Sequence, residues 1–88
     1  MFYTYILYSK KRDCYYIGST SDALEQRIRR HNSNHKGFTG HTGDWQLLYS
    51  EEFETKKLAL TREKKLKAWK SRKRIEALIN STGLEHSG

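Results

Sequence analysis

Two short hydrophobic runs open the chain, separated by four polar residues. If residues 2–9 form a strand, alternate side chains point to its two faces, and both faces carry mostly apolar or aromatic residues. Such a pattern is typical of a β-strand covered on both faces. Residues 14–18 form a second run of the same kind. The short connection between the runs predicts that they pair as an antiparallel hairpin.

The length of that connection also suggests a register. If Ser9 pairs with Cys14, Tyr5 lies opposite Gly18. Tyr5 and Tyr16 are then diagonal neighbours on one face of the hairpin, roughly 7–8 Å apart. Any tight hairpin between these runs brings the two tyrosines close together.

A helical pattern follows the hairpin. Asp22 and Glu25 have the spacing of a capping box, which predicts Asp22 as the N-cap and Glu25 as the third helical residue. At about 100° per residue, one stripe of this helix consists of Ala23, Leu24, Arg27, Ile28 and His31. An arginine and a histidine therefore occupy the face that the helix is expected to bury.

Residues 34–44 carry three glycines and two histidines without periodicity, and they are predicted to form a loop. The loop is long for so small a domain, which favours a functional surface. Residues 45–53 then predict a third strand. The residues expected on one side of this strand are Trp45, Leu47 and Tyr49.

The last third of the chain has helical patterning. Thr55 is predicted to be the N-cap of a helix that ends at Lys70, and Ser71 is predicted to cap a final helix. The residues of that helix expected to face inward are Ile75, Leu78 and Ile79. The order β-β-α-β-α-α predicts an α/β (α+β) sandwich on a small, at least partly antiparallel sheet.

The chain length and charge limit the kinds of site that such a fold can carry. We expect residues 1–82 to form one domain and residues 83–88, which are small and polar, to form a flexible tail. A domain of this length buries only about 60–65 % of the surface of its unfolded chain, so a site should lie on a face rather than in a deep cavity. Seventeen Lys and Arg against ten Asp and Glu give a net charge of +7. Such an excess favours a phosphate polyanion as partner, and a basic surface without a fixed partner is the alternative.

Cysteine content and hydropathy indicate the compartment. Cys14 is the single cysteine, so the sequence contains neither a disulfide framework nor a cysteine-based zinc site. No apolar run reaches the roughly 18 residues needed to span a bilayer, and the N-terminus lacks the layout of a secretion signal. We therefore expect no membrane partner and a reducing, cytoplasmic setting. Without a Gly-x-Gly-x-x-Gly or a P-loop, a nucleotide cofactor has no support.

Arg27 and His31 are the first candidates for chemistry. Taken singly, Arg27 is explained by a side chain that reaches past the apolar face, and His31 by a hydrogen bond to a carbonyl. Together, one turn apart beside a tyrosine-rich sheet, they are better explained as a site. A guanidinium matches the geometry of a phosphate, and an imidazole can accept a proton near neutral pH.

Glu63 is the second candidate. It lies at the edge of the apolar face formed by Ala59 and Leu66, among several lysines and arginines. One interpretation is an ion pair with one of these cations, and the other is a single carboxylate that holds Mg²⁺. The sequence leaves both open.

The tyrosines and histidines leave further alternatives. Ordinary packing explains most of the aromatic residues, namely Tyr3, Tyr8, Tyr15 and Tyr49. Tyr5 and Tyr16 would be the pair nearest Arg27 and His31 if the helix packs over their face. His31 and His35 have the i, i+4 spacing of some zinc sites, but the sequence offers no evident third ligand, so a zinc site is disfavoured.

These positions in order resemble a stand-alone GIY-YIG nuclease domain of the small single-domain bacterial type. Tyr3-Thr4-Tyr5 stands where the family has Gly-Ile-Tyr and keeps only the last tyrosine, whereas Tyr16-Ile17-Gly18 is an intact YIG. Arg27 follows Tyr16 by eleven residues, with His31 and Asn32 after it. The remaining match is an Ala-x-x-x-Glu-x-x-x-Lys segment that contains Ala59, Glu63 and Lys67.

The resemblance implies a three-stranded antiparallel central sheet flanked by helices. It also implies Mg²⁺- or Mn²⁺-dependent hydrolysis of DNA phosphodiester bonds, as in the repair and recombination nucleases that share this module. By this resemblance Glu63 would bind the metal, and Tyr5, as phenol or phenolate, would help to take a proton from the attacking water. Tyr16 would orient the water or the phosphate, Arg27 would clamp the phosphate, and His31 would assist proton transfer or hold Tyr5.

We therefore expect a metal-dependent DNA endonuclease. The residues expected to bind the DNA backbone are Lys10, Lys11, Arg12, Arg29, Arg30 and Lys36, together with the basic last helices. The DNA could be branched or otherwise structured, and a partner protein could supply specificity. The main alternative is a nucleic-acid-binding module of the same fold whose catalysis is weak or lost, and a small RNA-binding protein outside the family is a third.

Overall fold

The computed structural model describes residues 1–33, 36–37 and 39–87, with the backbone alone for residues 82–87. The described elements, in chain order, are β1 (Phe2–Ser9), β2 (Cys14–Thr20), α1 (Leu24–His31), β3 (Gln46–Phe53), α2 (Lys56–Trp69) and α3 (Arg72–Ser87). This order confirms the predicted β-β-α-β-α-α arrangement. No helix within these residues combines the length and apolar character needed to cross a membrane.

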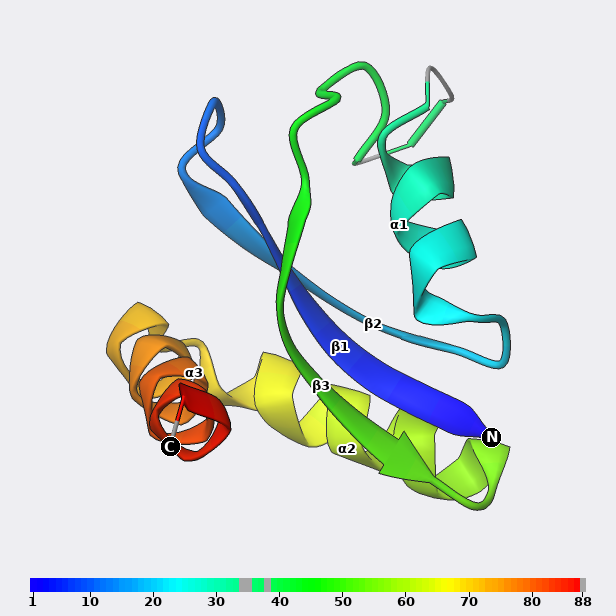
Figure 1. Ribbon diagram of the computed structural model, residues 1–88, viewed down its shortest axis with the longest axis vertical. Coiled ribbons are helices and arrows are strands. Elements are labelled where there is room, and N and C mark those ends of the chain that lie inside the picture. Colours follow the sequence, from blue (N-terminus) through cyan, green and yellow to red (C-terminus); the bar gives the residue numbers. More distant parts are fainter. Residues whose placement is uncertain (34–35, 38, 88) are drawn as a thin grey trace.

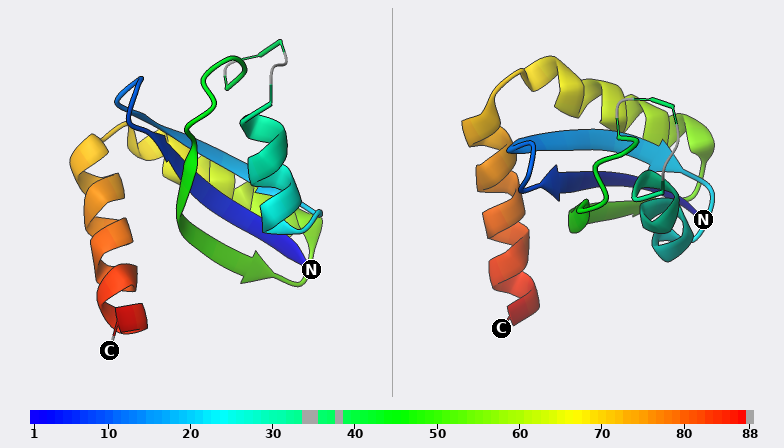
Figure 2. Two further views of the ribbon diagram at one scale, coloured as in Figure 1. Left: turned by 45° about the horizontal axis from the view of Figure 1, so that its top comes forward. Right: turned by 90° about the horizontal axis from the view of Figure 1, so that it is seen from above.

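The three strands form one antiparallel sheet in the order β2-β1-β3, so β1 lies in the centre. Helix α1 covers one face of the sheet, whereas α2 and α3 lie on the other (Figure 1). Seen from above, α2 runs alongside β2 and α3 crosses the far end of the sheet (Figure 2). Strands β2 and β3 each pair with β1 alone among the described residues, which leaves one edge of each strand open.

Two cores fill the spaces on either side of β1, because its residues alternate between the two faces. On the α1 face, Tyr5 and Leu7 pack with Trp45, and Leu24 and Ile28 of α1 close this cluster. The core of the opposite face consists of Ile6, Tyr49, Leu66 and Ile75, with Leu78 and Ile79 packed against it. The predicted inward faces of α1 and α3 are thus confirmed, except that Ala23 is exposed and precedes α1 as its N-cap.

The hairpin has the predicted register. Ser9 pairs with Cys14, and Tyr5 pairs with Gly18. The ring centroids of Tyr5 and Tyr16 lie 6.4 Å apart on the α1 face. Strand β2 continues two residues beyond Gly18 and ends at Thr20.

The prediction that Trp45, Leu47 and Tyr49 share one side of β3 is wrong. Leu7 of β1 pairs with Leu47 and Ile6 pairs with Tyr49, so Leu48 is an extra residue in β3 at this point. Such a bulge shifts the alternation of a strand by one position. Trp45 and Leu47 therefore face α1, whereas Tyr49 packs in the core beneath α2 and α3.

The capping box predicted at Asp22 and Glu25 is also wrong. Helix α1 begins at Leu24 after an N-cap at Ala23, with no side-chain capping bond. The backbone N–H of Asp22 donates to Thr20 Oγ1 over 3.0 Å, so a turn outside the helix involves this residue instead. Glu25 still lies in the first turn of α1, where its negative charge complements the helix dipole.

The ends of α2 and the start of α3 agree with prediction. The Thr55 hydroxyl accepts a hydrogen bond from the backbone N–H of Leu58 over 3.2 Å, and Lys70 ends α2 in a left-handed conformation with φ of 47°. Ser71 Oγ accepts a bond from the backbone N–H of Arg74 over 3.3 Å. Helix α3 then continues to Ser87, so its backbone includes most of the segment expected to form a tail, whose flexibility stays a prediction.

Three tyrosines outside the Tyr5–Tyr16 pair each donate a hydrogen bond to a carboxylate. Tyr8 binds Asp13 over 2.7 Å, Tyr15 binds Glu76 over 3.0 Å, and Tyr49 binds Glu51 over 2.6 Å. Tyr49 is 8 % exposed and Tyr15 is partly buried against the same core, as expected for packing residues.

The buried Tyr49 should make the protein less stable in alkaline solution. Burial and then the hydrogen bond to Glu51 raise its pKa from 10.0 to about 12. Above pH 10 the unfolded chain releases this phenol proton while the folded state retains it, so the free energy of unfolding falls between about pH 10 and pH 12. Tyr49→Phe removes this contribution, and urea unfolding across that range should show a shallower decline than in the parent. Equal slopes in the two proteins would contradict this prediction.

Candidate active site

The hydroxyl of Tyr5 is the centre of the candidate site. The Tyr5 side chain is 1 % exposed, and its Oη lies 2.8 Å from Nε2 of His31. Nε of Arg27 donates to the same oxygen over 3.3 Å. The two α1 residues that the sequence singled out therefore meet on one tyrosine of the central strand.

The second ring nitrogen of His31 is also bonded. Nδ1 lies 2.8 Å from Oγ1 of Thr39, and the carbonyl of Thr39 accepts a bond from Trp45 Nε1 over 2.9 Å. We assign the phenol proton of Tyr5 to the bond with Nε2, because Tyr5 Oη already accepts from Arg27; Nδ1 then donates to Thr39. The imidazole is 5 % exposed and held between the strand and the loop.

The environment favours the neutral form of Tyr5. Burial raises the pKa of Tyr5 above its ordinary value of 10.0 and outweighs the lowering by the hydrogen bond and charge of Arg27. The negative charge of Glu63 also raises this pKa, by the smallest of these contributions. The hydrogen bond to Tyr5 is in turn the main cause that raises the pKa of Arg27, which is therefore a permanent cation.

Tyr16 completes the aromatic part of the site. Its ring centroid lies 4.9 Å from that of His31 and 6.3 Å from that of Trp45. The side chain is partly exposed on the edge strand β2, whereas Tyr5 is buried on the central strand. Tyr16 is therefore placed where a ligand at this edge could reach it.

Glu63 approaches from the other face of the sheet. Its Oε1 accepts a 2.6 Å hydrogen bond from Ser19 of β2, the residue after Gly18, and its Oε2 forms a 2.7 Å ion pair with Lys67. Because neighbouring residues of a strand point to opposite faces, Ser19 and Tyr16 lie on different sides of β2. Glu63 and the Tyr5 cluster therefore adjoin β2, an edge strand, from opposite faces of the sheet.

Glu63 fits the chemistry of a Mg²⁺ ligand, although it belongs to no larger group of possible metal ligands in the described part of the chain. Among residues 1–33, 36–37 and 39–87, no group of three or more His, Cys, Asp or Glu could hold a metal. Each Glu63 oxygen has one hydrogen-bond partner and can accept more, and Mg²⁺ often binds one or two carboxylates while keeping several waters. His35, which the zinc alternative requires, lies outside the described residues.

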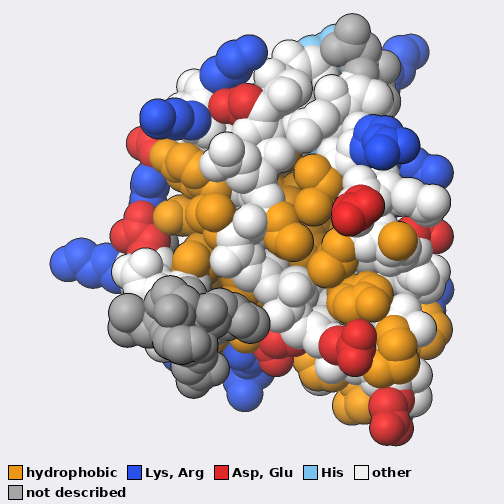
Figure 3. Space-filling model, viewed as in Figure 1, with side chains coloured by type: hydrophobic (Ala, Val, Ile, Leu, Met, Phe, Trp, Pro, Cys, Tyr) orange, Lys and Arg blue, Asp and Glu red, His pale blue; other side chains and the backbone are white. Residues whose placement is uncertain are grey.

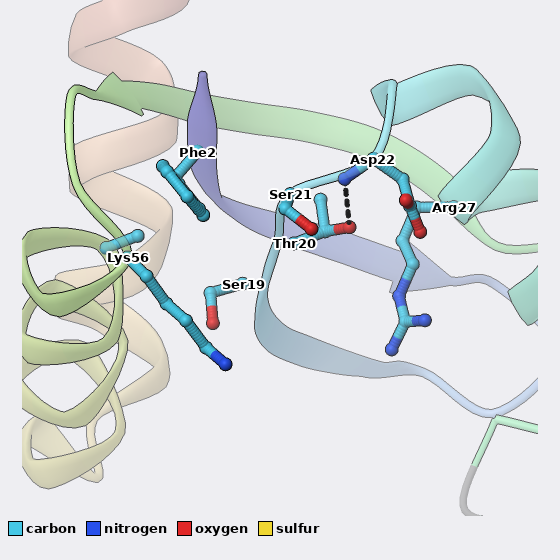
Figure 4. A pocket seen from close by; sticks show the side chains of 8 residues that line it. Phe2, Ser19, Thr20, Ser21, Asp22, Arg27 and Lys56 are labelled. Atoms are coloured by element: carbon cyan, nitrogen blue, oxygen red, sulfur yellow. Dashed lines mark hydrogen bonds between the residues drawn. The ribbon is translucent and has the colours of Figure 1, made fainter.

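A hollow of about 230 Å³ adjoins both halves of this arrangement. Arg27 lines it from α1, Ser19 from β2, and Lys56 from the start of α2 (Figure 4). Because Arg27 also binds Tyr5 and Ser19 also binds Glu63, the hollow borders the Tyr5 cluster and the carboxylate at once.

The residues expected to bind the DNA backbone are all exposed: Lys10, Lys11, Arg12, Arg29, Arg30 and Lys36. The hairpin tip contacts the loop before β3, since Nζ of Lys11 and NH1 of Arg12 each lie 3.4 Å from an oxygen of Thr42. Hairpin tip, loop and the end of α1 all lie at one end of the molecule (Figure 1). Their role in binding stays a prediction.

Comparison with protein families identifies this arrangement. The family model described as GIY-YIG catalytic domain matches residues 1–76. The chain belongs to the GIY-YIG family. The antiparallel three-stranded sheet with its three helices is the fold expected for a GIY-YIG domain. Searches of curated proteins and of solved structures yield no match.

The YIG glycine of this GIY-YIG domain has a steric role. A Cβ at Gly18 would stand 2.7 Å from Oη and 2.9 Å from Cζ of Tyr5, and 3.0 Å from Cε2 of Tyr16. The Tyr5 ring is buried, so it cannot move away without disturbing the site. Glycine is needed because the two tyrosines of the GIY-YIG motif pack over its backbone.

The sequence did not assign a role to three residues that support the site. Ser19 orients Glu63, Thr39 orients His31, and Asn32 accepts from the N–H and donates to the C=O of Trp45 over 2.7 and 3.1 Å. Asn32 stood in the motif without a role, and Ser19 stood beside YIG. Nothing in the aperiodic loop distinguished Thr39 from its neighbours.

Replacing Gly18 by alanine should destabilise the protein by about 1–3 kcal/mol through overpacking against Tyr5. In a Tyr5→Phe background, which removes the oxygen at 2.7 Å, the same replacement should cost less. Urea unfolding of the four proteins in this double-mutant cycle gives the coupling energy. Strictly additive costs would contradict the proposed contact.

Proposed function

We propose that the protein is a metal-dependent endonuclease that hydrolyses DNA phosphodiester bonds at the open edge of β2. Family membership supports a nuclease-type function. The observation that carries the proposal is the buried Tyr5 hydroxyl, which is hydrogen-bonded to a guanidinium and an imidazole together. A buried tyrosine that only packs needs one hydrogen-bond partner. The hydroxyl of Tyr5 has two, of which His31 can accept a proton and Arg27 can bind a phosphate.

Tyr5 and His31 form a route for the proton of the attacking water. In the free protein Tyr5 is a neutral phenol, because burial raises its pKa. Nε2 of His31 takes the phenol proton as the phenol oxygen takes a proton from water, so Tyr5 acts as a base without being a phenolate beforehand. The bond from Nδ1 to Thr39 holds the imidazole in the tautomer that this transfer requires.

Arg27 and Tyr16 act on the phosphate. Nε of Arg27 is bonded to Tyr5, which leaves its two terminal nitrogens on the side of the hollow beside β2 (Figure 4). A guanidinium in this position stabilises the negative charge that builds on the phosphate oxygens. Tyr16, partly exposed at the same edge, orients the water or the phosphate.

Glu63 would hold Mg²⁺ or Mn²⁺. When bound, the ion supplies Lewis-acid stabilisation of the scissile phosphate and of the leaving oxygen. Ser19 keeps the carboxylate turned toward β2, and Lys67 neutralises it until a cation competes for the same oxygen.

The charge of the surface supports DNA as the substrate. The side of the molecule with β3 in front carries apolar and acidic side chains over its centre and lower part, with most Lys and Arg toward its margins (Figure 3). Glu51 and Glu52 belong to β3, and Glu54 follows it. A phosphate backbone would therefore avoid this side and bind over the hairpin tip, the loop and α1.

A binding module that has lost its chemistry is the second candidate. Two features favour this candidate. Lys67 occupies the Glu63 carboxylate that would bind the metal, and the raised pKa of Tyr5 keeps its phenol protonated. Such a module would hold DNA through the same basic residues without cutting it.

Cleavage assays separate the two candidates. Supercoiled, linear, single-stranded and branched DNA should be tested with Mg²⁺, Mn²⁺ or EDTA. Cutting with either ion and none in EDTA is expected for an endonuclease. DNA binding without cutting of any of these substrates would establish the binding module instead.

Glu63→Gln should lower the rate of cutting by about 10²–10³, because it removes the carboxylate charge but retains an acceptor for Ser19. Glu52→Gln, which removes an exposed carboxylate from β3, is the matched control and should cut like the parent. Unchanged cutting by Glu63→Gln would overturn the metal assignment.

Tyr5→Phe should lower the rate by about 10²–10⁴, because the proton route begins at the missing hydroxyl. DNA binding should be retained, since the buried ring contributes no charge. Single-turnover cleavage and fluorescence anisotropy measure the two properties separately. A Tyr5→Phe protein that cuts at the parent rate would exclude Tyr5 as the base.

A further inference from the structure

The hollow beside β2 contains a cation that neither the motif nor the proposed chemistry uses. Lys56 lines it at the start of α2, facing Arg27 across the end of β2. In Figure 4 the Lys56 ammonium and the Arg27 guanidinium extend in the same direction, with Ser19 between them. Lys56 thus stands across the hollow from Arg27, the residue that binds Tyr5.

The Lys56 ammonium has no ion-pair partner within the described parts of the chain. The ion pairs there involve Arg62, Lys67 and Arg72, and Asp22 is the acidic residue among those that line the hollow. The charge of Asp22 acts on Arg27, whose pKa it helps to raise. The lining therefore carries two cations and one carboxylate, which gives it a net positive charge.

The rest of the lining suits a phosphate group. Ser19, Thr20 and Ser21 bring three consecutive hydroxyls to the wall, and Phe2 and Ala59 make its apolar part. The Thr20 hydroxyl accepts from the backbone of Asp22, so it can still donate its own proton. Cations together with hydroxyl donors are typical of sites that hold phosphate oxygens. Thr20 and Ser21 are the hydroxyls that can donate here, because Ser19 already donates its proton to Glu63.

The hollow also continues directly from the proposed site of chemistry. Arg27 belongs to both, and Ser19 joins the wall of the hollow to Glu63. A DNA strand whose scissile phosphate lies at Arg27 would place its next phosphate toward Lys56. We propose that this hollow is a phosphate subsite in which Lys56 binds the phosphate adjacent to the scissile one. The proposal rests on the proposed DNA-cutting function and adds to it a residue that positions the strand.

Binding in EDTA tests the subsite without any need for cutting. The logarithm of the affinity falls with the logarithm of the salt concentration by a slope of about 0.9 for each phosphate contact. Lys56→Gln should therefore lower the affinity for a short fluorescein-labelled duplex, and the loss should be about 3.5-fold larger at roughly 50 mM salt than at roughly 200 mM. Lys56→Arg should restore it.

Lys57→Gln is the matched control. Lys57 is the next residue of α2, equally charged and exposed, and does not line the hollow. Its replacement should leave the affinity close to that of the parent. Equal losses in Lys56→Gln and Lys57→Gln would overturn the subsite, because they would show a general effect of charge.

A duplex scan with single neutral methylphosphonates locates the contact. One neutralised phosphate should weaken binding to the parent protein and have no further effect on Lys56→Gln. If every neutralised phosphate weakened binding to Lys56→Gln as much as it weakens binding to the parent, the proposal would be overturned.

The outcomes also distinguish the subsite from the function. Coupling between Lys56 and one phosphate in a protein that never cuts DNA would overturn the proposed function and leave the subsite standing. If the parent cuts DNA with Mg²⁺ but Lys56→Gln binds DNA like the parent, the subsite would be overturned and the proposed function would stand.

Discussion

A single buried hydroxyl determines how this small domain is assembled. Tyr5 Oη is removed from water by the sheet and by α1, and a buried hydroxyl without partners costs about 1–3 kcal/mol. Its partners come from α1, whose position over the sheet therefore depends on the same bonds that define the site. The same network also fixes the position of the loop before β3, because Thr39 of that loop forms a hydrogen bond with Nδ1 of His31. Stability and candidate chemistry thus draw on one network.

The thinness of the domain explains why its site is divided by a strand. With one sheet of three strands, no deep cavity can form, and a carboxylate on α2 has to meet the groups of α1 around an edge. The open edge of β2 supplies that meeting place. Glu63 then needs an anchor in the strand itself, which Ser19 provides, and the edge stays accessible to a long polymer that could not enter a closed pocket.

Much of this arrangement could be predicted because simple periodicities decide it. The alternation of β1, the four-residue connection and the stripe on α1 were enough to place Tyr5, Tyr16, Arg27 and His31 together. The phase of β3 could not be read, because Leu47 and Leu48 are both apolar and either could begin the inward-facing set. Asp22 matched a capping motif, but the hydroxyl of Thr20 bonded its backbone instead. Lys56 was one lysine among many, and only the three-dimensional structure brought it opposite Arg27.

The bulge in β3 has a consequence for chain length. Leu48 is 39 % exposed and separates Leu47 from Tyr49. Without Leu48 these two residues would be neighbours in a regular strand and would still lie on opposite faces. A chain lacking this residue would keep every apolar side chain of β3 on its present face and would lose only the local bend and extra twist. Leu48 is thus an extra residue that bends β3 without changing which side chains it buries. This chain could therefore lose one residue at this place and still bury the same two cores.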